Sequence, residues 1–213
     1  MKNRTRKLTL GAMLCAAAFA AAAVGRVPVV LFLKYDPKDV VIALSGFMLG
    51  PAAAGAVASA ASVLEMLCVG TTGVIGCMMN ILSSCCFACT AAFIYQRRPG
   101  ALGAGLGLIA GCAAMTGVML LWNYWAVPLY MGQPRAEVAG LLLPVFLPFN
   151  LVKGALNGAL AFLFYRPVWR ALERAGLAPQ ESPPEGKGNA LLACAAAGAA
   201  VTCGVFLLAM HGV

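Results

Sequence analysis

The stretch ALGAGLGLIAGCAAMTGVMLLWNYW, residues 101–125, contains no Asp, Glu, Lys or Arg and forms one uninterrupted apolar run. A helix that crosses the ~30 Å hydrocarbon layer of a bilayer needs about 20 such residues. The stretch therefore predicts a transmembrane helix. Its apolar residues are continuous rather than alternating with polar ones, which argues against a strand of a membrane β-barrel.

The composition of the whole chain agrees with this stretch. Of its 213 residues, 62% are hydrophobic and 10% are charged, and the mean hydropathy is +0.89. Soluble domains carry about a quarter charged residues. The sequence therefore predicts an all-α integral membrane protein of the cell (inner) membrane, with six helices in a transmembrane bundle and a further helix at the C-terminal end.

Short polar breaks separate the expected helices. These helices are Thr9–Val24, Pro37–Leu49, Pro51–Val69, Val74–Tyr95, Ala101–Trp125 and Leu141–Tyr165. A loop at residues 26–36 joins the first two, and residues 127–139 are expected to form an irregular connection. Pro144 and Pro148 are expected to interrupt or bend the sixth helix, because proline lacks the N–H that a helix interior uses.

Polarity divides the chain into three parts. Residues 1–170 are expected to form the membrane domain, residues 171–188 a Pro-rich cytoplasmic linker, and residues 189–213 a seventh span. The first 25 residues also resemble a signal peptide, with four basic residues before an alanine-rich stretch. Cleavage is an alternative, but we expect a retained first helix.

The net charge of +8 could suggest nucleic acid, but the basic residues cluster at the ends of apolar runs, which is a topology signal. With a cytoplasmic N-terminus, the inner side holds Lys2, Arg4, Arg6, Lys7, Arg97, Arg98, Arg166, Arg170, Arg174 and Lys187. The outer side holds Arg26, Lys34, Lys38 and Arg135. This bias predicts a multi-pass protein with its N-terminus in the cytoplasm and no nucleic-acid partner.

Lys153 is the one basic residue expected at membrane depth. An uncompensated charge there costs ~3 kcal/mol on insertion scales, and such residues usually face a cavity or a partner. Asn150 and Asn157 share its helical face by their spacing. Three hydrogen-bonding groups on one face suit a polar ligand. The alternatives are bonds between helices, or a lysine that reaches out to the membrane surface.

A second candidate is Asn123, which lies between Trp122 and Tyr124-Trp125 near the outer end of its helix, with Tyr130 soon after. For the two tryptophans, an interfacial belt is the favoured interpretation. A buried amide needs a partner, however, and an amide among aromatic rings can orient a heteroaromatic ligand. Asn80, in the outer part of the fourth helix, follows the same logic more weakly.

A third feature is a stripe of small residues on the first helix. Ala12, Ala16 and Ala20 repeat every four residues, which permits close approach of another helix. That helix could belong to a partner or to this chain.

The sequence lacks the motifs of common enzymes. Gly186-Lys187 is followed by Gly188, so no P-loop is present. Nine cysteines form no pair of C-x-x-C motifs, and the only histidine is His211, so we expect no metal site. Glu65 is the only carboxylate within an apolar run. We expect no enzymatic activity.

Several blocks together resemble one family. They are FLKYDPKD at 32–39, GF at 46–47, GP at 50–51, NY at 123–124, PLY at 128–130 and PFNLVKG at 148–154. In this order they resemble the riboflavin-binding S component of energy-coupling-factor (ECF) vitamin transporters. The similarity covers about residues 9–169.

The resemblance implies a six-helix membrane protein that binds riboflavin in a pocket open to the outside, without a cofactor. Its site residues would be Leu33, Lys34, Tyr35, Asp36, Asn80, Asn123, Asn150 and Lys153. The alanine face with Ala12, Ala16 and Ala20 would dock on a transmembrane coupling protein driven by two ATPase subunits. ATP hydrolysis would then occur on those partners.

Some interpretations stay open at this point. Asp36 precedes Pro37 and can cap the second helix or contact the ligand. Lys34 and Tyr35 can form a mobile lid or a fixed wall. Many relatives carry a lysine in the third helix near the position of Glu65, so the role of Glu65 is unknown. Alternative functions are an S component for flavin mononucleotide (FMN), thiamine or pantothenate, a membrane enzyme acting on lipid headgroups, or a structural subunit.

Overall fold

The computed structural model describes residues 2–30, 33–69, 73–132 and 134–176. The helices are α1 Lys2–Gly25, α2 Lys38–Leu49, α3 Pro51–Cys68, α4 Gly73–Arg97, α5 Ala101–Met131, α6 Arg135–Leu141 and α7 Leu147–Arg174. A π-helical segment, η1 Leu142–Phe146, joins α6 to α7. The α7 helix thus continues into the expected linker, and the expected seventh helix at 189–213 lies outside the described residues.

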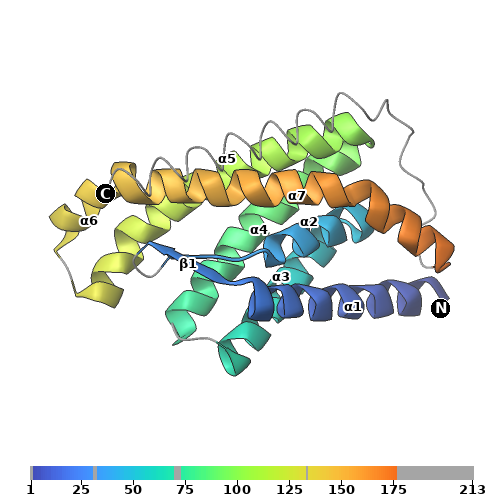
Figure 1. Ribbon diagram of the computed structural model, residues 1–213, viewed down its shortest axis with the longest axis horizontal. Coiled ribbons are helices and arrows are strands. Elements are labelled where there is room, and N and C mark those ends of the chain that lie inside the picture. Colours follow the sequence, from blue (N-terminus) through green and yellow to red (C-terminus); the bar gives the residue numbers. More distant parts are fainter. Residues whose placement is uncertain (1, 31–32, 70–72, 133, 177–213) are drawn as a thin grey trace.

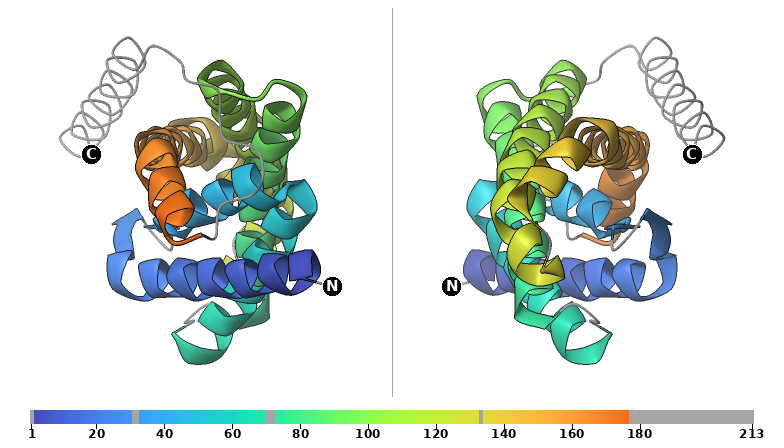
Figure 2. Two further views of the ribbon diagram at one scale, coloured as in Figure 1. Left: turned by 90° about the vertical axis from the view of Figure 1, so that its right-hand side faces the viewer. Right: turned by 90° about the vertical axis from the view of Figure 1, so that its left-hand side faces the viewer.

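The long helices form one bundle with the N-terminus and the end of α7 at the same end (Figure 1). The α4 and α5 helices pack along each other, and α7 lies against α5. In Figure 2, α7 is seen nearly end-on while α1 is still seen lengthwise, so α1 runs obliquely to α7. The α1 helix contacts α2 and α3, at the edge of the bundle.

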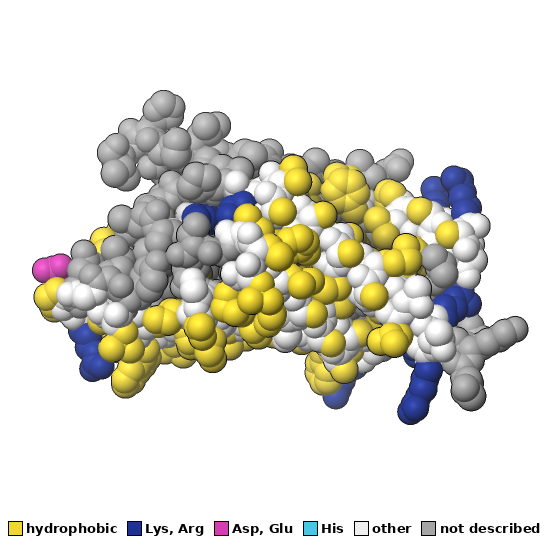
Figure 3. All heavy atoms as spheres, turned by 90° about the horizontal axis from the view of Figure 1, so that it is seen from below, with side chains coloured by type: hydrophobic (Ala, Val, Ile, Leu, Met, Phe, Trp, Pro, Cys, Tyr) yellow, Lys and Arg dark blue, Asp and Glu magenta, His cyan; other side chains and the backbone are white. Residues whose placement is uncertain are grey.

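Among the described residues, five helical stretches are long and apolar enough to cross a membrane. They are Arg4–Gly25, Pro51–Cys68, Gly73–Arg97, Ala101–Leu129 and Arg135–Arg174. The remaining helix of the bundle, α2, has only 12 residues and is buried along nearly all its length. Figure 3 shows many apolar side chains across one face, with most of its basic side chains toward the end that carries the N-terminus and others toward the opposite end. The expected six-helix membrane bundle is confirmed.

The loop expected at residues 26–36 instead contains a β-hairpin. Strands β1 Val27–Val30 and β2 Leu33–Tyr35 pair antiparallel, with an irregularity between Pro28 and Val30. The prediction of a plain loop was wrong, because strands this short carry too little periodicity to be recognised. We call the end of the bundle that carries this strand pair the hairpin end.

The irregular connection expected at 127–139 was also largely wrong. The α5 helix continues through Pro128 to Met131 and ends at Gly132, whose φ of 65° is left-handed. The Gly132 N–H donates to the Pro128 carbonyl at 3.0 Å, a common way to close a helix. Proline is tolerated here because it lies in the last turns, where few backbone bonds are lost.

Pro144 lies within the π-helical segment η1, which agrees with the expected interruption of the sixth helix. Proline removes one backbone donor, and a wider π-turn is a common local response. The helix recovers at once in α7, where the Asn150 side-chain amide donates to the Phe146 carbonyl at 2.7 Å. The segment thereby sets the start of the helix that carries Lys153.

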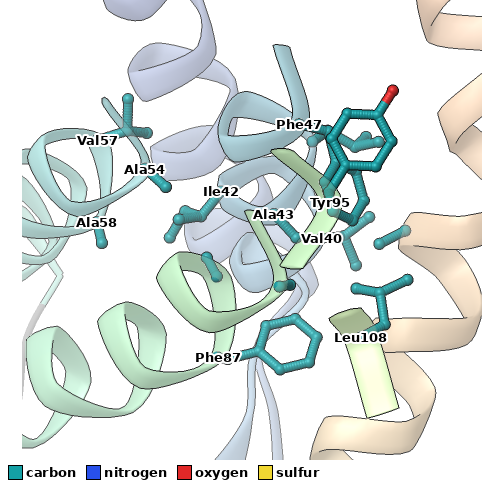
Figure 4. Close-up of a cluster of buried hydrophobic side chains, with 14 of the residues drawn as sticks. Val40, Ile42, Ala43, Phe47, Ala54, Val57, Ala58, Phe87, Tyr95 and Leu108 are labelled. Carbon is teal, nitrogen blue, oxygen red and sulfur yellow. The ribbon is translucent and has the colours of Figure 1, made fainter. Parts of the chain in front are cut away.

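The core consists largely of small and aromatic side chains from α2, α3 and α4 (Figure 4). Two glycines permit the closest helix approaches. A Cβ on Gly111 would lie 2.5 Å from the Phe87 carbonyl oxygen, and one on Gly154 would lie 2.5 Å from Cys112 Sγ. Small residues of this kind let membrane helices associate through van der Waals packing. Gly154 fixes the depth of its neighbour Lys153 against α5.

Candidate functional site

Six charged side chains converge at the hairpin end from α2, α3, α7 and the segment that precedes α2. We call this set the charge network, and its members are Arg26, Asp36, Lys38, Asp39, Glu65 and Lys153. Five of them are buried, and the side chain of Arg26 is 16% exposed. Three cations face three carboxylates, so the charges balance within the set.

Lys153 is 7% exposed and is held by groups of this chain. Its Nζ lies 3.3 Å from Asp39 Oδ2 and donates to Ser83 Oγ at 3.4 Å. The Asp39 carboxylate also accepts from Ser84 Oγ and, at 3.4 Å, from Asn157 Nδ2. Lys153 thus makes bonds between helices, one of the alternatives that the sequence left open. The first turn of α2 enters the bundle, which brings its carboxylate to the lysine.

The other four charges join α2 to α3. Lys38 pairs with Glu65 and lies 3.3 Å from Asp36, while Arg26 pairs with Glu65 and lies 3.6 Å from Asp36. Glu65 Oε1, the oxygen that pairs with Arg26, also accepts from Asn80 Nδ2 at 2.8 Å. Glu65 thus balances two cations and holds an amide of α4, which answers the question of its role that the sequence left open.

Asp36 acts as a helix cap, as one of the two sequence interpretations predicted. Its Oδ1 accepts the backbone N–H of Lys38 at 3.0 Å. A carboxylate in this position satisfies a free N–H and interacts favourably with the positive end of the helix. Because the same side chain pairs with Lys38 and Arg26, its capping role and its place in the charge network coincide.

Asn157 attaches the hairpin to α7. Its Nδ2 donates to the Asp36 carbonyl at 3.3 Å, and its Oδ1 accepts the Tyr35 hydroxyl at 2.9 Å. Burial raises the pKa of the Tyr35 phenol well above its ordinary value, and the negative charges of Asp39 and Asp36 raise it further, so the phenol keeps its proton and donates. Asn157 was noted beside Lys153 but not assigned to the site, although their i, i+4 spacing carried the signal.

Asn123 differs from all these groups. Its side chain is 0% exposed, and neither its amide nitrogen nor its amide oxygen has a hydrogen-bond partner among the residues that the structure describes. It lies on α5 one turn before Val127, which packs with Leu33, Val138 and Phe146. Burying an amide without a partner costs ~1–3 kcal/mol. A ligand group that bonds this amide would remove that cost.

The predicted site residues therefore fall into three groups. Tyr35, Asp36, Asn80 and Lys153 meet in or beside the charge network. Leu33 is buried in the apolar cluster next to Val127, while Lys34 is half-buried on β2. Asn150 uses its amide nitrogen on its own helix, and Asn123 is unpartnered among the described residues.

The predicted docking stripe points away from the bundle. Ala12, Ala16 and Ala20 are exposed, whereas α1 packs inward through Leu10, Ala18 and Ala22. The described helices therefore do not cover the stripe. Near the hairpin end, Trp125 is 60% exposed under the Arg135 guanidinium, as an interfacial residue is expected to be, and Trp122 packs partly against the core.

Comparison with known proteins decides the family. The sequence profile described as the substrate-specific component of ECF transporters matches residues 6–165. This chain belongs to the ECF S-component family. The family assignment made from the sequence is confirmed, and with it a multi-pass membrane protein.

Named relatives of this S component include two riboflavin transporters. FmnP of Bacillus subtilis (strain 168) is 32% identical over 132 residues, which cover 58% of this chain and 70% of the relative. RibU of Staphylococcus aureus (strain TCH60) is 30% identical over 149 residues, 67% of this chain and 78% of the relative. A solved S component of a bacterial ECF transporter superposes with a TM-score of 0.67 at 29% identity, over 82% of this chain and all of that one.

Proposed function

We propose that this S component captures riboflavin from outside the cell for ATP-driven uptake by partner subunits. The similarity to two proteins named riboflavin transporters supports the ligand. The observation that carries the proposal is the Asn123 amide, fully buried and without a partner in the described part of the chain. An amide in this state is prepared to bond a polar ligand.

Binding would use the two kinds of surface that meet at the hairpin end. The apolar cluster of Leu33, Val127, Val138 and Phe146 is buried beside Asn123 and would contact a flat ring in the complex. Asn123, one turn away on α5, would orient the ligand, and Asn150 and Lys153 would bond hydroxyl groups. Since Lys153 is already paired with Asp39, its contribution would be a shared hydrogen bond rather than a free charge.

The first experiment is an absorption spectrum of the purified protein, followed by titration with riboflavin while tryptophan fluorescence is recorded. Copurified flavin or saturable quenching is the expected result. A colourless protein whose fluorescence does not change would contradict the proposal. FMN, thiamine and pantothenate, tested in a thermal-shift panel, would identify another vitamin if one of them stabilises the protein instead. Stabilisation by none would favour a structural subunit.

The proposed role of the buried Asn123 amide is tested with the variant Asn123→Ala. It should weaken riboflavin binding by ~1–3 kcal/mol, because a hydrogen bond made in the complex is lost. Gln96→Ala, near the C-terminal end of α4, is the control for a general effect of removing an amide, because Gln96 is exposed and lies outside the proposed site. Equal affinity of Asn123→Ala and the wild type would remove Asn123 from the site.

The partner proposal concerns the exposed alanine face of α1. We expect it to dock on a transmembrane coupling protein that two ATPase subunits drive. Ala16→Leu should abolish uptake in cells that contain the complete transporter, because a larger side chain prevents close helix approach. Riboflavin affinity of the purified variant should stay unchanged. Loss of affinity, or full uptake, would contradict a docking role.

A further inference from the structure

The balance of charge at the hairpin end has a consequence for ligand choice. Arg26, Lys38 and Lys153 each lie beside a carboxylate of this chain. A fourth cation, Lys34, is half-buried on β2. A ligand bound among these groups therefore meets hydrogen-bond donors and acceptors, while the three cations of the charge network are already neutralised.

Glu65 has a central part in keeping the net charge of the charge network at zero. It is the only carboxylate of the network on α3, and it faces both Lys38 and Arg26. Without it, the two cations would share Asp36 alone, and the network would carry one net positive charge. Charges interact strongly in a buried site because the local dielectric is low.

Glu65 is also connected to the proposed ligand residues. Its Oε1 accepts from Asn80, and Ser83, one turn further along α4, accepts from Lys153. The carboxylate and the lysine thus act on the same face of α4. A change of charge at Glu65 would therefore change the electrostatic potential where the polar part of the ligand would lie.

We propose that Glu65 is a specificity-determining residue that makes the site select neutral ligands over their phosphate esters. This inference deepens the proposed function, on which it rests, by naming the ligand class as an uncharged flavin. A phosphate ester carries about −1.5 to −2 charge at pH 7. Each of the three cations of the charge network is already paired with a carboxylate, so the network would take the phosphate out of water without offering it a free counter-charge.

The test compares dissociation constants for riboflavin and for FMN, measured by tryptophan quenching on full-length protein. In Glu65→Gln, the ratio of the FMN constant to the riboflavin constant should fall at least about tenfold, since a net positive charge favours the phosphate. Arg26→Gln removes a cation instead, so the same ratio should rise at least about threefold, less because Arg26 lies at the rim. A role limited to holding the hairpin would weaken both ligands equally and leave the ratio unchanged.

Two further variants make the result specific. Glu137→Gln removes an exposed carboxylate from the first turn of α6 and should leave the ratio at the wild-type value. Lys38→Met combined with Glu65→Gln restores neutrality and should return the ratio toward the wild type. A Glu65→Gln ratio within threefold of the wild type, or an equal shift in Glu137→Gln, would overturn the proposal.

If Glu65→Gln cannot be purified folded, Arg26→Gln decides, and an unchanged ratio in that variant would overturn the proposal. The riboflavin constant of the wild type tests the proposed function separately. Tight riboflavin binding with an unresponsive ratio would refute only the role of Glu65. Absence of riboflavin binding in the wild type would refute the proposed function itself.

Discussion

The charge network and the surroundings of Asn123 are both buried at the hairpin end, yet their hydrogen-bonding groups are satisfied to very different degrees. In the network, every carboxylate has at least two partners from this chain. At Asn123, both polar atoms of the amide lack a partner among the described residues. The difference indicates that the network stabilises the fold, whereas the Asn123 amide adds no hydrogen bond to it among the described residues.

A matched pair of asparagines makes the comparison concrete. Asn157 and Asn123 are both almost fully buried. Asn157 bonds Tyr35 and Asp36 from the hairpin and Asp39 from α2. Removing a satisfied amide should destabilise the fold, and removing an unsatisfied one should not.

The largest effect is expected for Asp39→Ala. The substitution leaves Lys153 buried without its counter-charge and removes acceptors from Ser84 and Asn157, so the free energy of unfolding should fall by ~3–5 kcal/mol. Thermal unfolding in detergent measures the change. Combining Asp39→Leu with Lys153→Met removes both charges and should recover most of the loss. An unaltered unfolding midpoint for Asp39→Ala would show that the pair contributes little.

Next in size is Asn157→Ala. The variant frees the Tyr35 hydroxyl and leaves the Asp36 carbonyl with one donor fewer, so we expect a loss of ~1–3 kcal/mol in the same assay. Faster proteolysis within residues 26–36 should accompany it, because Asn157 attaches the hairpin to α7. If this variant were as stable as the wild type, the satisfied amide of Asn157 would contribute no more to folding than the unsatisfied amide of Asn123.

A smaller loss, ~0.5–1.5 kcal/mol, is expected for Tyr35→Phe, which removes one neutral hydrogen bond and keeps the ring. Since the phenol keeps its proton up to strongly alkaline pH, the difference between Tyr35→Phe and the wild type should be constant across the neutral range. Because a phenol with the ordinary pKa of about 10 is still mostly protonated at pH 9, a difference that disappears by pH 9 would mean that the pKa of Tyr35 is lowered rather than raised.

Asn123→Ala should have the smallest effect on folding, within ~0.5 kcal/mol of the wild type or slightly stabilising in the absence of ligand. The small cavity costs free energy, but the variant no longer buries an amide without a partner. Added riboflavin should then stabilise the variant less than it stabilises the wild type. A large loss of stability without ligand would place Asn123 with Asn157 as a structural residue.

Much of the fold could be read from the sequence alone. Apolar runs such as residues 101–125 determine membrane helices, because a bilayer accepts only segments that satisfy their own backbone and expose apolar side chains. The family-like blocks around residues 32–39 and 148–154 were enough to name the S-component family. Asn123 was proposed as a candidate because a buried amide needs a partner; its burial is confirmed, and its role in binding stays a prediction.

Only the tertiary structure decided which charges meet. Asp39 and Lys153 are far apart in the chain, and so are Lys38 and Glu65. Periodicity assigns a residue to a helix face but does not say which face of another helix lies opposite. Once α2 is packed inside the bundle, an uncompensated charge is too costly to bury, and that requirement pairs the lysine with Asp39. The same packing buries the Asn123 amide without a partner among the described residues, which is the basis of the proposal that it bonds a ligand.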